Sequence, residues 1–177
     1  DISQLAPLDG YDSKITGSSK PEDIKDSDVV IITAGIPRKP GMNREDLLEI
    51  NIKIITDVAN NLKKYAPNAF VIVLSNPIDA IVYSFYKVSG FKKNKVVGMA
   101  GVLDSTRFKT FLAMETGYST QDIQCMVLGG HGDTMVPVTR LATIGGIPAE
   151  ELISKEKLDA IVERTRFGGG ELVKLFG

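Results

Sequence analysis

The chain contains one histidine, His131, within the glycine-rich segment 129–133 (Gly-Gly-His-Gly-Asp) that follows the apolar run 123–128. Histidine is the side chain type whose ordinary pKa lies closest to physiological pH, so it can accept or donate a proton there without further tuning. Flanking glycines let the backbone turn sharply and bring the imidazole close to a reacting molecule. A buried, hydrogen-bonded histidine in a tight turn would produce the same pattern. We interpret the segment as an active-site loop because of the residues that precede it.

Asp104 and Arg107 are three residues apart in a stretch with a helical pattern, which places both side chains on one helix face. Taken alone, they would form a surface ion pair that contributes less than ~1 kcal/mol to stability. Next to a histidine, the carboxylate can accept a hydrogen bond from the imidazole, fix its tautomer and stabilise its protonated form. The guanidinium can then bind a substrate carboxylate through two parallel hydrogen bonds.

Two more arginines, Arg38 and Arg44, belong to a segment in which Pro37, Pro40 and Gly41 disfavour regular structure. This segment directly follows an expected strand, and loops at strand ends often carry functional residues. Both cations can equally be ordinary solvated side chains, so the segment gains a function only in combination with the histidine loop.

Hydrophobic periodicity predicts the elements that must position these residues. In the first half of the chain we expect strands at 14–17, 29–33, 70–74 and 96–98, a brief helix starting near Pro21, and helices at 43–65 and 79–88. The β-branched run 29–33 is typical of a strand that is buried on both faces. Alternating strands and helices indicate βαβ units, hence a doubly wound parallel sheet with polar chemistry at the carboxyl ends of its strands.

After Gly98 the pattern changes. We expect helices at 104–116, 148–153 and 157–176, and antiparallel strands at 123–128 and 136–142 on either side of the histidine loop. Each of the three glycines at 168–170 disfavours helix by roughly 1 kcal/mol relative to alanine, so we expect the last helix to break there. The predicted fold class is α/β, with a parallel sheet followed by a smaller α+β part.

The overall composition limits the classes of partner. The 177 residues are 43% hydrophobic and 24% charged, with a net charge of −1 and no basic cluster, so we expect neither nucleic acid nor a membrane surface as a partner. No apolar run approaches the ~20 residues that span a bilayer. The single cysteine excludes an internal disulfide and favours a reducing compartment, the cytoplasm. One histidine and one cysteine cannot supply the usual zinc ligand sets, so we expect no metal; a site made of oxygen ligands alone is the alternative that the composition leaves open.

Five short motifs follow one another along the chain: Thr33-Ala34-Gly35, the segment 37–44 (Pro-Arg-Lys-Pro-Gly-Met-Asn-Arg), Leu74-Ser75-Asn76-Pro77, Leu103-Asp104-Ser105-Thr106-Arg107 and Gly130-His131-Gly132-Asp133. Because it contains these five motifs in this order and spacing, the chain resembles the NAD-dependent malate and lactate dehydrogenase family, especially the lactate-dehydrogenase-like malate dehydrogenases of bacteria. The resemblance implies NAD as the cofactor. It also implies part of a Rossmann-type dinucleotide-binding domain in residues 1–98 and part of an α+β substrate domain in residues 99–177.

The resemblance assigns roles to individual residues. His131 matches the family's proton acceptor, and Asp104 matches the residue that orients it. Arg107 matches the residue that holds the C1 carboxylate of the substrate, and Arg44 matches the loop residue that polarises the reacting carbonyl. Arg38 occupies the position at which malate dehydrogenases bind a second carboxylate and at which lactate dehydrogenases typically carry glutamine.

A second set of positions matches residues that contact the cofactor. This set consists of Thr33, Ala34, Gly35, Asn51, Leu74, Ser75 and Asn76. In the family the asparagine at Asn76 contacts the substrate as well as the nicotinamide.

The implied activity is the reversible oxidation of (S)-malate to oxaloacetate, a small dicarboxylate, by a homodimer or homotetramer. Lactate or another 2-hydroxy acid is the alternative substrate, and a non-catalytic fragment that only binds or assembles is a third interpretation. The family's glycine-rich phosphate turn and its last strands have no counterpart in the sequence. We therefore expect unpaired sheet edges and exposed apolar faces.

Overall fold

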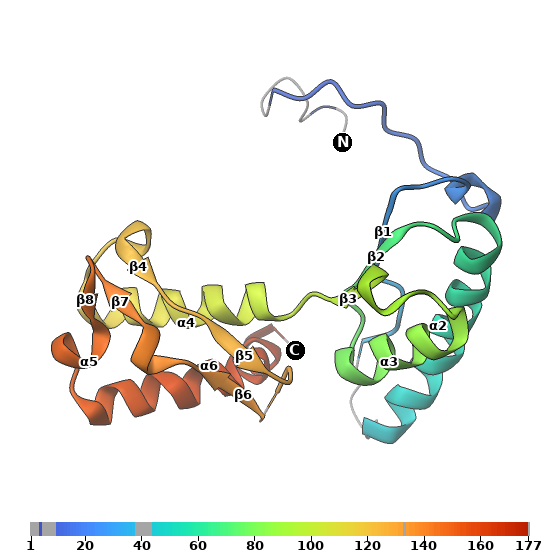
Figure 1. Ribbon diagram of the computed structural model, residues 1–177. Coiled ribbons are helices and arrows are strands. Elements are labelled where there is room, and N and C mark those ends of the chain that lie inside the picture. The colour runs from blue at the N-terminus through green and yellow to red at the C-terminus, as the bar shows by residue number, and fades with distance from the viewer. Residues whose placement is uncertain (1–3, 5–9, 38–43, 133, 177) are drawn as a thin grey trace.

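The computed structural model describes residue 4 and residues 10–37, 44–132 and 134–176, which form two lobes joined by the short stretch between β3 and α4 (Figure 1). The first lobe consists of η1 (Pro21–Ile24), β1 (Val29–Ile32), α2 (Arg44–Tyr65), β2 (Phe70–Val73), α3 (Ile78–Ser89), η2 (Lys93–Lys95) and β3 (Val96–Gly98). The second lobe consists of α4 (Gly101–Thr116), η3 (Thr120–Asp122), β4 (Ile123–Gln124), β5 (Val127–Gly129), β6 (Met135–Pro137), η4 (Thr139–Leu141), β7 (Thr143–Ile144), β8 (Ile147–Pro148), α5 (Ala149–Leu152) and α6 (Lys155–Phe176).

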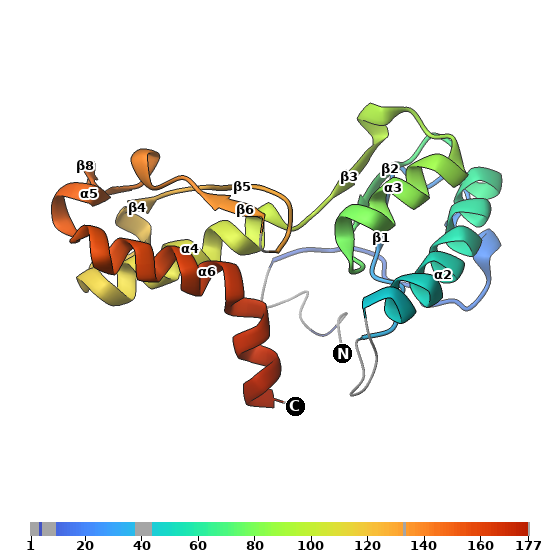
Figure 2. The same ribbon diagram turned by 90° about the horizontal axis from the view of Figure 1, so that it is seen from below.

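The first lobe is a parallel sheet in the order β1-β2-β3, with Ile31 opposite Ile72 and Ile72 opposite Val97. The helices α2 and α3 lie side by side on one face of this sheet (Figures 1 and 2). Their apolar stripes and the inward side chains of the strands form one buried core, which includes Ile55, Val71 and Phe85. The α/β class with a parallel sheet, predicted from the alternation of strand and helix patterns, is confirmed.

Two details of the first lobe differ from the sequence prediction. The strand β1 is not buried on both faces, because Val29 and Ile31 are 56% and 60% exposed. Successive side chains of a strand point to opposite faces, and no described element covers the face away from α2 and α3. The expected strand at 14–17 is also absent: these residues are exposed and have no ladder partner among the described strands, and an unpaired segment cannot satisfy a strand's backbone groups.

The second lobe packs α4 against α6 and places small antiparallel sheets beside them. Its core is a second buried cluster that includes Phe108, Leu112, Ile123 and Ile144. The two long strands expected around the histidine loop are divided. β5 and β6 form the hairpin that carries the loop, whereas β4 and β7 pair in a separate sheet. The run 123–128 is thus divided between two sheets, and η4 separates β6 of one sheet from β7 of the other.

The helix α6 is continuous from Lys155 to Phe176, so the break expected at the three glycines is wrong. Figure 2 shows instead that α6 bends toward its C-terminal end. Burial of its inward face against α4 offsets the poor helix propensity of glycine. Neither α6 nor any other helix in the described part of the chain combines the length and the apolar character needed to cross a bilayer.

Candidate active site

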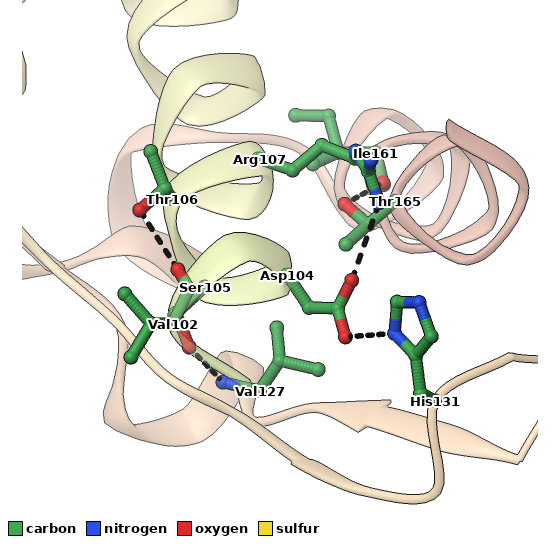
Figure 3. Close-up of polar contacts among 9 residues, drawn as sticks. All are labelled: Val102, Asp104, Ser105, Thr106, Arg107, Val127, His131, Ile161 and Thr165. Atoms are coloured by element: carbon green, nitrogen blue, oxygen red, sulfur yellow. Dashed lines mark hydrogen bonds and ion pairs between the residues drawn. The ribbon is translucent and has the colours of Figure 1, made fainter. Parts of the chain in front are cut away.

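The histidine loop and the start of α4 meet through a short hydrogen bond. His131 Nδ1 lies 2.8 Å from Asp104 Oδ2 (Figure 3). An ionised carboxylate only accepts hydrogen bonds, so Nδ1–H is the donor, and in the neutral imidazole Nε2 then carries the lone pair. The Asp104 side chain is 3% exposed, whereas that of His131 is 24% exposed. The buried carboxylate thus fixes the imidazole tautomer while the imidazole itself remains accessible.

The second oxygen of the same carboxylate binds Arg107. The Arg107 guanidinium donates through Nη1 to Asp104 Oδ1 over 3.2 Å, and the Arg107 side chain is 14% exposed. Asp104 therefore holds a histidine and an arginine at once, one on each oxygen (Figure 3). A guanidinium has five N–H donors, so Arg107 keeps donors for an anionic ligand after it has bound Asp104.

Packing of α4 positions this cluster. Asp104 lies in the first turn of α4 and Arg107 one turn later, while the fully buried Phe108 fixes the helix against the core of the second lobe. Ser105 Oγ accepts a hydrogen bond of 2.9 Å from the backbone N–H of Val127, at the start of β5. This bond ties α4 to the strand that leads to His131.

Among the described residues, a backbone hydrogen bond of His131 connects the histidine loop to the first lobe. The backbone N–H of His131 donates to Asp79 Oδ2 over 3.3 Å, and Asp79 lies in the first turn of α3. Asn76 precedes Asp79 by three residues. The contact therefore places the N-terminal end of α3, which begins two residues after Asn76, next to the histidine loop.

The turns after β1 and β2 are held together by a buried amide. Asn51, which is almost fully buried in α2, accepts from the backbone N–H of Ile36 and donates to the carbonyl oxygen of Asn76, each over 2.8 Å. Ser75 donates through its hydroxyl to the carbonyl oxygen of Ala34. Both strands thus end in turns that are fixed side by side, at the carboxyl edge of the sheet.

Gly35 is required in the first of these turns. Its φ is 154°, and a Cβ at this position would lie 3.2 Å from Asn51 Oδ1. The carboxyl ends of parallel strands are where α/β sheets bind nucleotides. The two turns that Asn51 and Ser75 hold together lie at this edge of the sheet.

The structure places the predicted site residues in two groups. His131, Asp104 and Arg107 form the cluster in the second lobe. The other group consists of the turn residues Thr33, Ala34, Gly35, Leu74, Ser75 and Asn76 with Asn51 behind them. Arg38 lies outside the described residues. Arg44 is the first residue of α2, and its side chain lies outside the described part.

Sequence reasoning did not single out Asp79. In the sequence it appears as an acidic residue in the first turn of a helix, which is sufficient to explain its presence there. Its bond to His131 joins residues 52 positions apart, so no local pattern indicates it. Among the described residues there is no group of three metal-ligating side chains.

The fold and the cluster together define a class of protein: two-lobed α/β proteins with a histidine–aspartate–arginine cluster in one lobe and a parallel sheet in the other. The histidine backbone bonds to the first turn of the helix that follows the second strand of this sheet. Comparison with known families narrows this class. The lactate/malate dehydrogenase NAD binding domain matches residues 1–98, and the lactate/malate dehydrogenase alpha/beta C-terminal domain matches residues 101–176. The chain belongs to the lactate/malate dehydrogenase family.

Similar proteins carry both names of the family. A malate dehydrogenase of Myxococcus xanthus is 60% identical over 99% of this chain and 56% of its own length. The apo malate dehydrogenase of Picrophilus torridus is 49% identical, with a TM-score of 0.93 over 99% of this chain and 56% of that chain. A lactate dehydrogenase of Cryptosporidium parvum, complexed with lactic acid and cofactor, is 47% identical, with a TM-score of 0.89 over 98% and 56%. The chain spans about half the length of these relatives.

Proposed function

We propose that the protein containing this chain interconverts (S)-malate and oxaloacetate with NAD, and that His131 is its proton acceptor. The observation that supports this best is the 2.8 Å bond between His131 Nδ1 and the buried carboxylate of Asp104. It leaves Nε2 free to accept the hydroxyl proton of the substrate. It also supplies a counter-ion for the imidazolium that results.

The remaining groups orient the substrate. Arg107 binds the C1 carboxylate with the donors that Asp104 does not use, while Asn76 and Arg44 act on the hydroxyl or carbonyl at C2. When bound, the nicotinamide accepts the hydride that leaves C2. The turns at 33–35 and 74–76, joined through Asn51, provide the backbone surface for the cofactor. The first lobe is then the dinucleotide-binding part, and the second lobe is the substrate part.

Malate is favoured over lactate by one residue. Arg38 can hold the second carboxylate of oxaloacetate through two parallel charge-assisted hydrogen bonds. With pyruvate, the same arginine would enter a closed site without a partner, and an unpaired buried charge costs several kcal/mol. The malate dehydrogenases similar to this chain agree with this choice. Lactate is the second candidate, because a lactate dehydrogenase shares 47% of the residues and the same fold.

Substrate preference tests the proposal. In the full-length protein, the variant Arg38→Gln should lose most of its activity with oxaloacetate and gain activity with pyruvate. The ratio of the two kcat/KM values should shift by up to ~10⁴, since a site built for a polar group rejects the analogue that lacks it by that order. Arg140→Gln, which changes an exposed arginine of η4, is the matched control and should leave the ratio unchanged.

The malate assignment fails if the unaltered protein already prefers pyruvate, or if the ratio does not move in Arg38→Gln. Native mass measurement of the same sample tests the homodimer or homotetramer that we propose as its assembly. A full-length protein that reduces neither substrate would also contradict the proposed activity. The third interpretation, a non-catalytic fragment, concerns the 177 residues by themselves and predicts that this chain alone reduces neither substrate.

A further inference from the structure

The side chain of Arg107 occupies the space that a side chain at position 168 would need. Gly168 lies on α6, and a Cβ built on it would be 2.3 Å from Arg107 Cδ and 2.8 Å from Arg107 Nε. Non-bonded carbon atoms have their optimal separation at about 3.5–4.0 Å. Arg107 can hold its observed position only because residue 168 has no side chain.

Gly168 belongs to the face of α6 that packs against α4. Ile161 and Thr165 precede it on this face at helical spacing, and all three residues are buried. Figure 3 shows Arg107 reaching from α4 toward this part of α6 while its guanidinium bonds to Asp104. Arg107 thus bonds to a carboxylate on its own helix and fills the space beside Gly168 of the opposite helix.

The two glycines that follow behave differently. Gly169 and Gly170 are exposed, and a Cβ on either would meet no described atom within 4 Å. Glycine is the poorest helix former apart from proline, so helix formation would favour alanine at all three positions. Only at position 168 does the structure oppose this preference.

We propose that Gly168 is a positioning residue, which sets the affinity for the substrate carboxylate by leaving room for the side chain of Arg107. This inference rests on the proposed role of Arg107 in binding that carboxylate. A Cβ at position 168 displaces the arginine stem, so the guanidinium no longer reaches Asp104 and the substrate together. His131 keeps its bond to the other oxygen of Asp104.

The test compares Gly168→Ala with Gly169→Ala in the full-length protein. We expect Gly168→Ala to raise the KM for oxaloacetate by about 10- to 100-fold, the usual effect of losing a hydrogen bond to a charged group. We expect a smaller loss in kcat, an unchanged pH profile and unchanged NADH affinity, because the arginine holds ground state and transition state alike. Gly169→Ala should match the unaltered protein in all four measurements and have a higher Tm.

Arg107→Ala separates this inference from the function on which it rests. If Gly168 acts through Arg107, adding Gly168→Ala to Arg107→Ala should cause no further rise in KM. If Arg107→Ala itself leaves the KM unchanged, the proposed role of Arg107 is wrong. If Arg107→Ala raises the KM but Gly168→Ala behaves like Gly169→Ala, only the inference about Gly168 is wrong.

A folding defect would also be informative. If Gly168→Ala does not fold, the double variant with Arg107→Ala should fold again, because the shortened side chain frees the space for the new Cβ. A double variant that also fails to fold would overturn the inference.

Discussion

The substitution Asp104→Asn tests the centre of the site, because it preserves the shape of the side chain and removes one acceptor. In the structure each carboxylate oxygen accepts a hydrogen bond from its own donor. Oδ2 accepts from His131 Nδ1–H over 2.8 Å, and Oδ1 accepts from the Arg107 guanidinium over 3.2 Å. An asparagine offers one carbonyl oxygen and one amide donor. It therefore cannot accept from both neighbours.

The arginine decides how the amide turns. Since Arg107 has only donors, the amide oxygen of the variant should face Arg107 and its NH₂ group should face His131. The imidazole must then accept at Nδ1 and carry its proton on Nε2, the atom that should receive the substrate proton. Losing general base catalysis costs about 10²–10⁴ in rate. Losing a hydrogen bond to a charged group costs about 1.5–3 kcal/mol, so we expect kcat/KM to fall by at least about 10².

Steady-state NADH oxidation with oxaloacetate measures this loss. NADH binding by fluorescence should change little, because both bonds described for the Asp104 side chain go to His131 and Arg107 in the second lobe. Asp159→Asn, an equal change at an exposed position of α6, is the matched control. If Asp104→Asn retains nearly the full kcat/KM and the pH profile of the unaltered protein, Asp104 does not set the tautomer of His131.

Two further predictions follow from the same region. His131→Asn should lower turnover by about 10²–10⁴ with little change in NADH binding, and near-normal turnover would contradict its role as proton acceptor. Burial raises the pKa of the Cys125 thiol, an effect that Lys109 partly opposes. A raised pKa leaves less of the reactive thiolate at neutral pH, so iodoacetamide should alkylate Cys125 more slowly than a free cysteine peptide and should speed up as the pH rises. Equal rates at neutral pH would show that the thiol is not shielded.

Local features of the structure could be predicted from the sequence with good accuracy. The apolar stripe of α2 and the β-branched runs of β1 and β2 depend on spacings of two to four residues, which the sequence displays directly. Gly90 and Gly117 end their helices in the left-handed conformation, as a residue without Cβ does most easily. The five motifs led to the family for the same reason, since each is a short contiguous segment.

The sequence also indicated part of the site. Asp104 and Arg107 share a helix face because of their three-residue spacing, and their ion pair is present in the structure. The contact of Asp104 with His131 was a chemical expectation, and it is present over a separation of 27 residues. The catalytic and binding roles of these residues remain predictions until the variants are measured.

Only the tertiary structure decided which distant segments meet. The hydrogen bond from His131 to Asp79 joins the two lobes. Gly168 on α6 leaves space for the side chain of Arg107 on α4. From the sequence alone, Gly168 looked like a helix breaker, because helix propensity counts the cost of glycine and cannot include the side chain that fills its place. The exposure of Ile31 and the division of the run 123–128 between two sheets likewise depend on which elements pack nearby. Hydrophobic periodicity shows which helix or strand a segment can form and which of its faces is apolar. Packing between elements determines which residues each side chain contacts.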